Sequence, residues 1–199
     1  EIDSIPIANF TTSANPSSGC APSVIDFTNT STGNNITSYS WSVSPSSGWR
    51  FTNSTSSSSK SPQITFSSAN SYTVSLSVTN GCGTGNKSQT VVISSKPTID
   101  LDSIANHCGS YSFSPTATFN SNSNTITAYS WNLTGGSPSS STSQSPGSVT
   151  YSSAGSYTIT ASATNACGTG SSSRSFTVNP LPNAQTSGNQ TICVGTSVN

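Results

Sequence analysis

The sequence predicts an all-β protein made of tandem β-sandwiches, and three observations support this prediction. No apolar pattern with the 3.6-residue period of a helix continues for more than one turn. Apolar and polar residues instead alternate over short segments such as residues 72–79, which is typical of strands with one buried face and one solvent-facing face. Finally, a set of short motifs occurs twice in the same order, about 85 residues apart, which indicates repeated units.

The repeated motifs define the units. Tyr-Ser-Trp at residues 39–41 returns at 129–131, and Thr-Asn-Xaa-Cys-Gly-Thr-Gly at 79–85 returns at 164–170. Self-similarity of this kind predicts an array in which each unit is one sandwich. The expected domains cover residues 1–96, 97–180 and 181–199, the last being the truncated start of a third unit. We therefore interpret the chain as part of a longer protein.

Period-two alternation between turn residues places the individual strands. In the first unit we expect strands at residues 7–12, 24–29, 38–43, 64–66, 72–79 and 89–93. In the second unit we expect them at residues 99–101, 112–119, 128–133, 148–151, 157–163 and 173–178. Trp41 and Trp131, midway along the third strand of each unit, are the expected core anchors. Tyr72 and Tyr157 stand where a tyrosine corner would tie a loop to the following strand.

The composition limits the function classes. Of 199 residues, 50 are Ser and 29 are Thr, whereas only ten carry a charge and the net charge is zero. Disordered chains usually combine low hydrophobicity with high net charge, so we expect a folded chain with a hydroxyl-rich surface. A neutral chain lacks the basic patch of a nucleic-acid-binding protein, and no apolar stretch approaches the ~18 residues that cross a bilayer. We expect neither nucleic-acid binding nor membrane insertion.

The order of motifs in each unit resembles the polycystic kidney disease (PKD) domain. The pattern runs from Phe-Thr-Asn-Thr-Ser at residues 27–31 through Tyr-Ser-Trp to Ser-Tyr-Thr-Val at 71–74, and the resemblance covers residues 6–95 and about 98–179. It implies tandem immunoglobulin-like (PKD-type) β-sandwiches. The acidic turn Asp-Phe-Gly-Asp-Gly that commonly follows the Trp in this family is absent here, so the resemblance implies no ion-binding role for that turn.

The end of the chain carries a second resemblance. Residues 182–195 are similar to the openings of Ig-like repeats in giant secreted surface proteins of Bacteroidota. Those proteins are typically exported by the type IX secretion system and serve in adhesion or gliding. The resemblance therefore implies an adhesin-type array secreted by that route.

Five cysteines occupy matched positions. Cys20 and Cys108 precede the second strand of their units, Cys82 and Cys167 follow the penultimate strand, and Cys193 lies in the truncated unit. Matched cysteines in a lightly charged, Ser-rich chain favour disulfides, and hence an extracellular or cell-surface location. The single His and the lack of Cys-Xaa-Xaa-Cys pairs argue against a zinc site.

Two disulfide pairings stay open. We expect bonds within the units, Cys20–Cys82 and Cys108–Cys167. Geometry offers an alternative, because the two cysteine positions of one immunoglobulin-like unit lie at opposite ends, ~26 Å apart along a strand of about eight residues. Bonded cysteines need Cα atoms about 4.4–6.8 Å apart. The alternative is a Cys20–Cys167 staple between the units, which would leave Cys82 and Cys193 for neighbouring units and convert a flexible string into a stiff rod.

No pattern of residues predicts an enzyme, a cofactor or a metal site. Ser is so frequent that a Ser near His107 carries no information, and we expect His107 to be a loop residue. Asp100 and Asp102 share one strand face and could form a carboxylate pair or a cation site. We favour the alternative, a solvated charged edge that resists aggregation.

Trp49 and Arg50 form a candidate binding surface. They lie in a stretch after Trp41 that is longer than its counterpart after Trp131. Trp and Arg are enriched in binding hot spots, so the pair could hold a sugar or a protein partner. The favoured alternative is an added edge strand whose aromatic side chains pack onto the sandwich.

The tripeptide Asp-Ser-Ile occurs at residues 3–5 and 102–104, near the start of both units. It matches the Asp-(Ser/Thr)-aliphatic sequon that Bacteroidota use for O-glycosylation of exported proteins. The resemblance therefore implies Ser4 and Ser103 as candidate O-glycosylation sites. The alternative is two ordinary strand ends.

Together these observations predict a non-catalytic structural or adhesive repeat array of a long extracellular bacterial protein, acting as a stalk or as part of a surface appendage. The expected partners are neighbouring repeats of the same chain, other copies in a fibre or oligomer, and surface polysaccharide. The alternatives are a carbohydrate- or protein-binding module and the accessory repeats of a secreted hydrolase.

Overall fold

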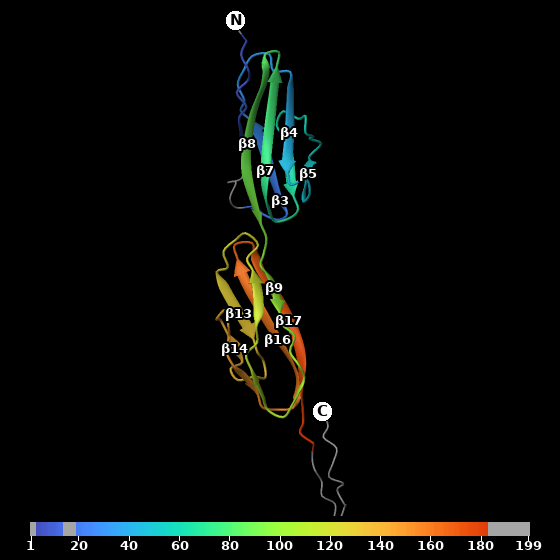
Figure 1. Cartoon of the computed structure of the whole chain (residues 1–199), viewed down its shortest axis with the longest axis vertical. Helices are drawn as coiled ribbons and strands as arrows, with labels where there is room; N and C mark the ends of the chain where they lie inside the picture. Colours follow the sequence, from blue (N-terminus) through green and yellow to red (C-terminus); the bar gives the residue numbers. More distant parts are fainter. Residues whose placement is uncertain (1–2, 14–18, 183–199) are drawn as a thin grey trace, which may run out of the picture.

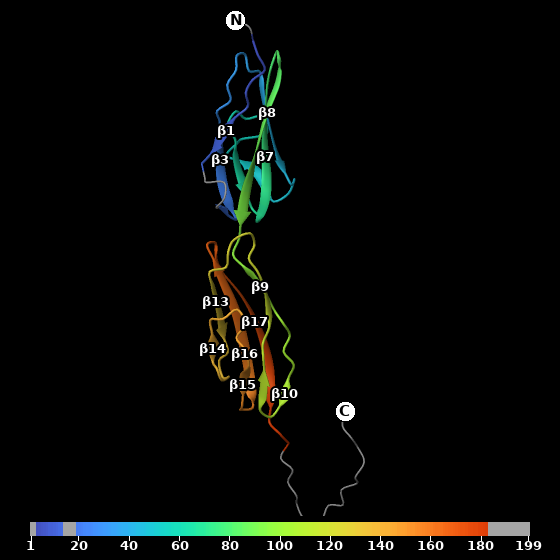
Figure 2. The ribbon, with the colours of Figure 1, turned by 60° about the vertical axis from the view of Figure 1, so that its left-hand side comes forward.

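The computed structural model describes residues 3–13 and 19–182. Two β-sandwiches lie end to end along one long axis, with the first in the upper half and the second in the lower half of Figure 1. A second view keeps the same alignment and shows a narrow waist where the first unit leads into the second (Figure 2). The expected third unit, with Cys193, falls mainly on residues 183–199, which lie outside the described residues.

The first sandwich consists of two four-stranded sheets. One sheet has the order β1-β3-β6-β5, formed by Phe10–Thr12, Ser23–Asn29, Gln63–Phe66 and Trp49–Thr52. The other has the order β2-β8-β7-β4, formed by Gly19–Cys20, Gly83–Ser94, Asn70–Asn80 and Ser38–Ser44. All neighbours are antiparallel except the short β2, which runs parallel to the end of β8. The added strand β5 lies at the edge of the first sheet.

The second sandwich repeats this plan with a less continuous face. Its large sheet has the order β10-β17-β16-β13-β14, formed by His107–Cys108, Gly168–Asn179, Gly155–Asn165, Ala128–Asn132 and Ser140–Ser141. The opposite face is two separate pairs, β12-β9 and β11-β15, formed by Ala117–Asn120 with Thr98–Leu101 and Tyr111–Phe113 with Val149–Tyr151. The all-β, immunoglobulin-like sandwich predicted from the sequence is confirmed.

Each unit has its own hydrophobic core around one Trp. Trp41 is 3% exposed and its ring lies 5.0 Å from that of Phe10. Trp131 is 1% exposed and lies 6.1 Å from Phe119. Each indole N–H donates to a loop carbonyl, Ser59 O in the first unit and Ser143 O in the second. Both Trp residues anchor their cores as predicted, with the polar N–H satisfied as burial requires.

The predicted tyrosine corners are also present. The hydroxyl of Tyr72 donates to Gly48 O and Ser68 O, at 3.1 and 3.0 Å, and that of Tyr157 donates to Ser153 O at 2.8 Å. In each unit a glycine with positive φ, Gly48 or Gly135, lies against the ring. A Cβ there would approach Tyr72 Oη or Tyr157 Cε1 to 2.5 Å, so the turn requires glycine for two reasons.

The strand predicted at residues 112–119 is wrong as one continuous element. The structure divides it into β11 and β12 around Pro115, which is buried. Counted from Cys20 and Cys108, Pro115 occupies the place of Phe27 in the first unit. Proline has no N–H to donate to a sheet ladder, so the strand breaks there. His107, expected in a loop, instead lies in β10 beside Val178 of β17.

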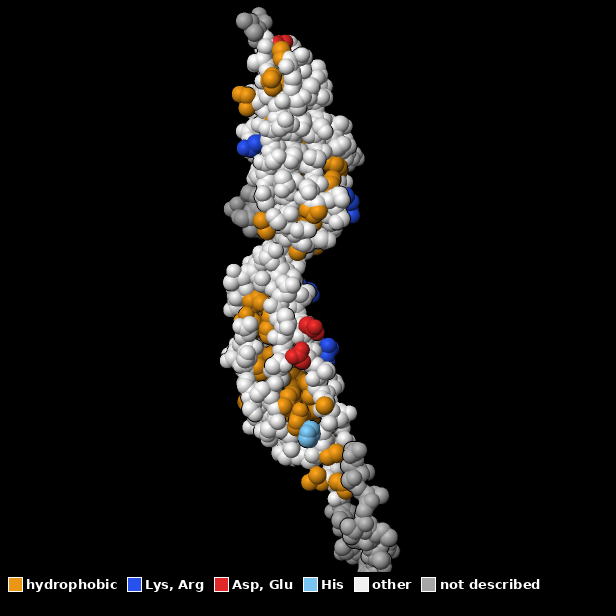
Figure 3. Space-filling model, in the orientation of Figure 1, with side chains coloured by type: hydrophobic (Ala, Val, Ile, Leu, Met, Phe, Trp, Pro, Cys, Tyr) orange, Lys and Arg blue, Asp and Glu red, His pale blue; other side chains and the backbone are white. Residues whose placement is uncertain are grey.

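Hydroxyl groups pair across the outer faces of the long hairpins. In the first unit, Ser75 and Ser88 lie 2.8 Å apart and Thr79 and Thr84 lie 2.9 Å apart, oxygen to oxygen. Three further pairs follow the same hairpin in the second unit, Thr158 with Ser175, Thr160 with Ser173, and Thr164 with Thr169. The face of the molecule in Figure 3 carries only a few Lys, Arg, Asp and Glu side chains among its uncharged ones.

Candidate functional site: the disulfide-linked junction

The two units are joined by a linker of only three residues. β8 ends at Ser94 and β9 begins at Thr98. The linker passes so close to β17 that a Cβ at Gly170 would overlap the carbonyl oxygen of Pro97. A glycine at this position therefore lets the linker lie directly on the second unit.

Asn165 holds the linker and the turn after β16 together. Its side-chain amide donates to Ser95 O at 2.8 Å and to Ser121 O at 3.1 Å. Its Oδ1 accepts the backbone N–H of Cys167 at 2.8 Å. The residue is 4% exposed, so these bonds satisfy a buried amide whose loss of partners would be costly.

A disulfide between Cys20 and Cys167 crosses the junction, with the Cα atoms 5.5 Å apart. Cys20 ends β2 of the first unit and pairs with Ser94, the last residue of β8, in the parallel register. Cys167 lies in the turn between β16 and β17 of the second unit. The bond therefore ties the lower end of one sandwich to the upper end of the next.

The expected pairing within units is wrong. Neither Cys20–Cys82 nor Cys108–Cys167 forms; Cys82 and Cys108 are free and exposed. The physical reason is the one that favoured the alternative: long strands separate the two cysteine positions of one unit, whereas end-to-end stacking brings those of adjacent units together.

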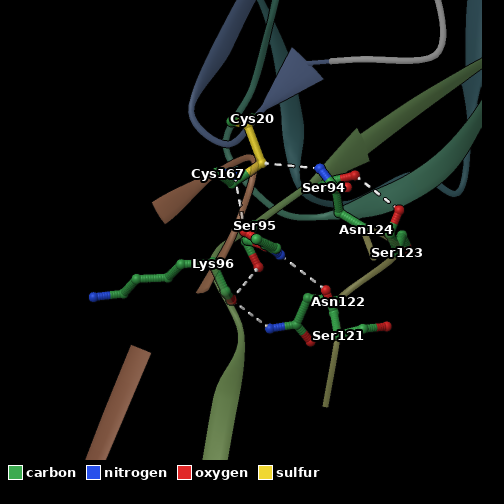
Figure 4. Close-up of a disulfide and its surroundings, with 10 residues drawn as sticks. Cys20, Ser94, Ser95, Lys96, Ser121, Asn122, Ser123, Asn124 and Cys167 are labelled. Carbon is green, nitrogen blue, oxygen red and sulfur yellow. Dashed lines mark hydrogen bonds between the residues drawn. A yellow bond between two sulfur atoms is a disulfide. The ribbon is translucent and has the colours of Figure 1, made fainter. Parts of the chain in front are cut away.

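Three further hydrogen bonds stabilise the junction around the disulfide (Figure 4). Ser94 Oγ donates to Ser123 O at 3.1 Å, and Ser94 is 3% exposed. The backbone N–H of Ser95 donates to Asn122 O, and Asn122 Nδ2 donates to Lys96 O at 2.8 Å. These bonds join the end of β8 and the linker to the loop after β12, so the two units are held together beside the disulfide as well as through it.

Trp49 and Arg50 lie in β5, the edge strand beside β6. The indole N–H of Trp49 donates to Pro45 O at 2.8 Å, and its ring lies edge-on to Phe51 at 5.3 Å. Trp49 and Phe51 are partly buried against the first core, whereas Arg50 is exposed. The structure thus places these residues in an edge strand, and binding at Arg50 stays a prediction.

Ser4 and Ser103 are both exposed, but they do not occupy equivalent positions. Ser4 O accepts a hydrogen bond from Asn80, as Ser95 O does from Asn165, so Ser4 corresponds to the linker of the second unit. Ser103 instead follows the strand β9. The repeated tripeptide is therefore not a structural repeat, and O-glycosylation stays a prediction at both sites.

The charged and aromatic residues of the second unit have local partners. Asp100 lies 3.7 Å from the guanidinium of Arg174, with the two side chains 86% and 45% exposed, and Asp102 accepts from the hydroxyl of Thr116. The ring of His107 stacks on that of Tyr111 at 4.2 Å. Within residues 3–13 and 19–182, no three His, Cys, Asp or Glu side chains gather in a group that could hold a metal ion. None of the described residues forms a helix long and apolar enough to span a bilayer.

Fold and junction define a tandem-repeat module of β-sandwiches joined end to end. Two models of the PKD domain match the chain, one over residues 3–95 and the other over residues 110–178. The chain therefore carries two PKD-type, immunoglobulin-like repeats, a class of module that is generally non-catalytic. No curated protein matches it.

Several solved structures are similar to this chain. An I-band fragment of titin is 14% identical with a TM-score of 0.45; the match covers 89% of this chain and 66% of the fragment. The PKD1 domain of Vibrio anguillarum Epp is 25% identical with a TM-score of 0.33, covering 46% of this chain and 96% of that domain. The PKD1 domain of the Vibrio cholerae metalloprotease PrtV is 26% identical with a TM-score of 0.32, covering 45% and 96%.

Sequence reasoning missed the roles of Asn165 and Gly170. Both lie in the repeated motif Asn-Xaa-Cys-Gly-Thr-Gly, which was used only to establish the repeat. The signal was available, because Asn before a turn and glycines at fixed spacing indicate local hydrogen bonding and close backbone approach. What the motif could not reveal is that the approaching segment is the linker.

Proposed function

We propose that the two repeats form a stiff, non-catalytic section of an extracellular array that acts as a stalk or as part of a surface appendage. The Cys20–Cys167 bond carries this proposal, because it fixes the angle between two units that a three-residue linker alone would leave free to bend. A disulfide of this kind persists in oxidising surroundings, which supports placement outside the cell.

The position of the bond along the chain supports a load-bearing role. Its two cysteines lie 147 positions apart in the sequence, so the covalent loop encloses both sandwiches apart from the segments before Cys20 and after Cys167, which include β1 and β17. When the chain is pulled by its ends, tension passes to Cys20, crosses the bond and continues from Cys167. The residues between them bear no tension and cannot be extended.

The proposed partners follow from the same geometry. Neighbouring repeats of the chain are the primary partners, because the junction is formed by one repeat contacting the next. Lateral packing with other copies in a fibre and contact with surface polysaccharide stay predictions. The adhesive role and secretion by the type IX system also stay predictions, supported by the resemblance of residues 182–195 to surface-protein repeats.

Single-molecule stretching of the 199-residue chain by its termini, in which Cys82 and Cys108 have no neighbouring unit to bond, tests the load-bearing role. We expect Cys20→Ser to extend farther than the oxidised parent by roughly 500 Å, since about 3.3–3.6 Å per residue is released over the enclosed segment. Cys82→Ser is the matched control, because Cys82 is free and the junction bond stays intact. Equal extension of the parent and Cys20→Ser would contradict the proposal.

Location is tested separately on cells that produce the protein. Antibody against the folded repeats should label intact cells or material released into the medium. Labelling that appears only after the cells are lysed would contradict an extracellular array, whatever the result of the stretching experiment.

A further inference from the structure

The free cysteine at the lower end of the second unit occupies the same position as the bonded cysteine of the first. Cys20 pairs in parallel with the last residue of β8, and Cys108 pairs in parallel with the last residue of β17. The backbone N–H that follows each cysteine donates back to that last residue, Ala21 to Ser94 O at 2.8 Å and Gly109 to Asn179 O at 2.9 Å. The lower end of each unit is therefore built in the same way.

The upper end of the first unit matches the upper end of the second. Asn80 donates to Ser4 O and Asn34 O, at 2.7 and 3.0 Å, and accepts the N–H of Cys82 at 2.9 Å. These are the bonds that Asn165 makes to the linker, to the neighbouring loop and to Cys167. The asparagine is buried in both units, at 5% and 4% exposure.

The backbone approach at the upper end is repeated as well. A Cβ at Gly85 would overlap the carbonyl oxygen of Pro6, as one at Gly170 would overlap that of Pro97. The segment around Ser4 therefore lies on the first unit as the linker around Ser95 lies on the second. By this correspondence Asp3 takes the place of Ser94, the residue that pairs with Cys20 in the closed junction.

The free thiol of Cys82 lies at the upper end of the first unit, in the position that Cys167 occupies at the upper end of the second. Its Sγ donates to Asp3 O at 3.3 Å. In the closed junction, Cys20 at the lower end of the first unit pairs with Ser94, and Asp3 takes the place of Ser94 at the upper end of the first unit. A preceding unit whose last strand runs into Asp3 would therefore present its own lower-end cysteine beside Cys82. The same reasoning applies to Cys108, which lies beside the end of β17.

From this correspondence we propose that Cys82 and Cys108 are crosslinking sites for adjacent β-sandwich units of the same polypeptide, with a fixed polarity. Cys82 bonds to a cysteine of the Cys20 type, which precedes the second strand of the unit before. Cys108 bonds to a cysteine of the Cys167 type, in an Asn-Xaa-Cys-Gly-Thr-Gly segment of the unit after. The inference goes beyond the stalk function and depends only on the geometry of the two unit ends.

Bond formation needs an oxidant, and a small-molecule or protein disulfide supplies it by exchange. The thiolate of one cysteine attacks the oxidant and forms a mixed disulfide, which expels one thiolate. The partner cysteine then attacks the sulfur of its neighbour and expels the second thiolate. The two cysteine thiols are oxidised, the oxidant disulfide is reduced to two thiols, and the two protons are transferred to those thiols or to water.

With this polarity the covalent loops overlap. The loop closed by Cys20 and Cys167 contains both Cys82 and Cys108, so the loop of the unit before ends inside it and the loop of the unit after begins inside it. A break in one bond would then release only the part of the chain that no neighbouring loop encloses. This predicts a continuous crosslinked rod rather than separate stapled pairs.

Peptide mapping of the full-length protein from its native source tests the pairing. Free thiols are blocked with N-ethylmaleimide before a non-reducing digest, and crosslinked peptides are identified by mass spectrometry, with Cys20–Cys167 as the internal reference. We expect Cys82 joined to a cysteine that precedes a second strand, and Cys108 joined to a cysteine in an Asn-Xaa-Cys-Gly-Thr-Gly segment. Blocked Cys82 or Cys108, a bond between two cysteines of one type, or a bond between Cys82 and Cys108 of one chain would overturn the proposal.

Electrophoresis with and without reductant shows whether the partner cysteine belongs to the same polypeptide or to a separate copy. We expect one band of single-chain mass in both conditions. A ladder that collapses on reduction would mean that separate copies are joined, which overturns the assignment to one polypeptide. Both results are independent of the stretching experiment, so failure of the pairing and failure of the load-bearing role can be told apart.

Discussion

The first sandwich closes both of its faces with four-stranded sheets, whereas one face of the second is two separate strand pairs. Two changes account for the difference. Pro115 replaces the aromatic residue Phe27 and interrupts the strand, and in the second unit the edge strand β5 is reduced to a single bridge between Ser137 and Thr150. The same plan thus tolerates a broken sheet, provided that a closed core forms behind it.

The cores differ in the way they are filled. Opposite the central Trp, the first unit has Leu76 and the second has Ala161. The second unit compensates with aromatic side chains: Tyr151 and Phe176 lie 5.0 Å apart with edge-to-face rings, and Phe113 lies 5.5 Å from Phe176. The two units therefore reach a closed core with different side chains, as expected where total volume matters more than identity.

The upper ends of the two units, in contrast, are nearly identical. Asn, Cys, Gly, Thr and Gly recur in the same spacing at residues 80–85 and 165–170, and their hydrogen bonds recur with them. Between these two copies, the residues of the upper end, which in the second unit contact the linker and Cys20, vary less than the residues that fill the core. The junction therefore imposes the tighter geometric requirement.

The largest expected effect distinguishes the two cores. Trp41→Ala and Trp131→Ala should each cost about 3–5 kcal/mol of unfolding free energy. The loss should be larger for Trp41, whose ring contacts both Phe10 and Phe27, than for Trp131, which contacts Phe119. Urea denaturation measures the total loss of unfolding free energy, and hydrogen exchange of peptides from each unit shows which unit has lost stability. A larger loss for Trp131→Ala would contradict this comparison of the cores.

An intermediate effect distinguishes the two tyrosine corners. Gly48→Ala should destabilise more than Gly135→Ala, because Tyr72 is fully buried and held by two carbonyls, whereas Tyr157 is half-buried and can move outward. Gly147→Ala is the control: its φ is +81° and a Cβ would meet nothing within 4 Å, so it reports backbone strain alone, roughly 1–2 kcal/mol. Thermal unfolding of the three variants tests the order, and a loss for Gly48→Ala no greater than the control would refute it.

The smallest expected effect concerns two buried phenols. Burial raises the pKa of Tyr72, and burial followed by the nearby Tyr157 raises the pKa of Tyr151. A raised folded-state pKa means that, as pH rises, the unfolded chain loses these two protons before the folded chain does. The contribution of the two phenols to the free energy of unfolding is therefore constant below about pH 10 and falls as pH rises above it. Phenolate absorbance should show two late titrations. Tyr157→Phe should lower only the pKa of Tyr151, and a shift of Tyr72 as well would contradict the assignment.

Alternation and repeats were sufficient to predict the sandwiches, both Trp anchors and both tyrosine corners. These features depend on local periodicity and on burial, which a single sequence displays directly. The long hairpins were predicted too short, because their ends, such as Thr84 to Ser88, contain no apolar side chains and so show no alternation.

Features that depend on contacts between distant segments were harder to predict from the sequence. The Cys20–Cys167 disulfide is one of two pairings that the sequence leaves open, since the choice rests on how units stack rather than on spacing within one unit. The similarity between Asp-Ser-Ile at residues 3–5 and 102–104 suggested an equivalence that the hydrogen bonds of Ser4 and Ser95 disprove. Pro115 was a visible warning that the strand around it would break.

The paired hydroxyls on the outer faces have a consequence for the surroundings in which the protein can work. Hydroxyl pairs carry no net charge, so dissolved ions cannot screen them as they screen surface ion pairs. The exposed Arg174–Asp100 contact is the single ion pair in the described part of the chain. The fold is therefore suited to keep the same stability from fresh water to brine, where a charge-laced surface would weaken.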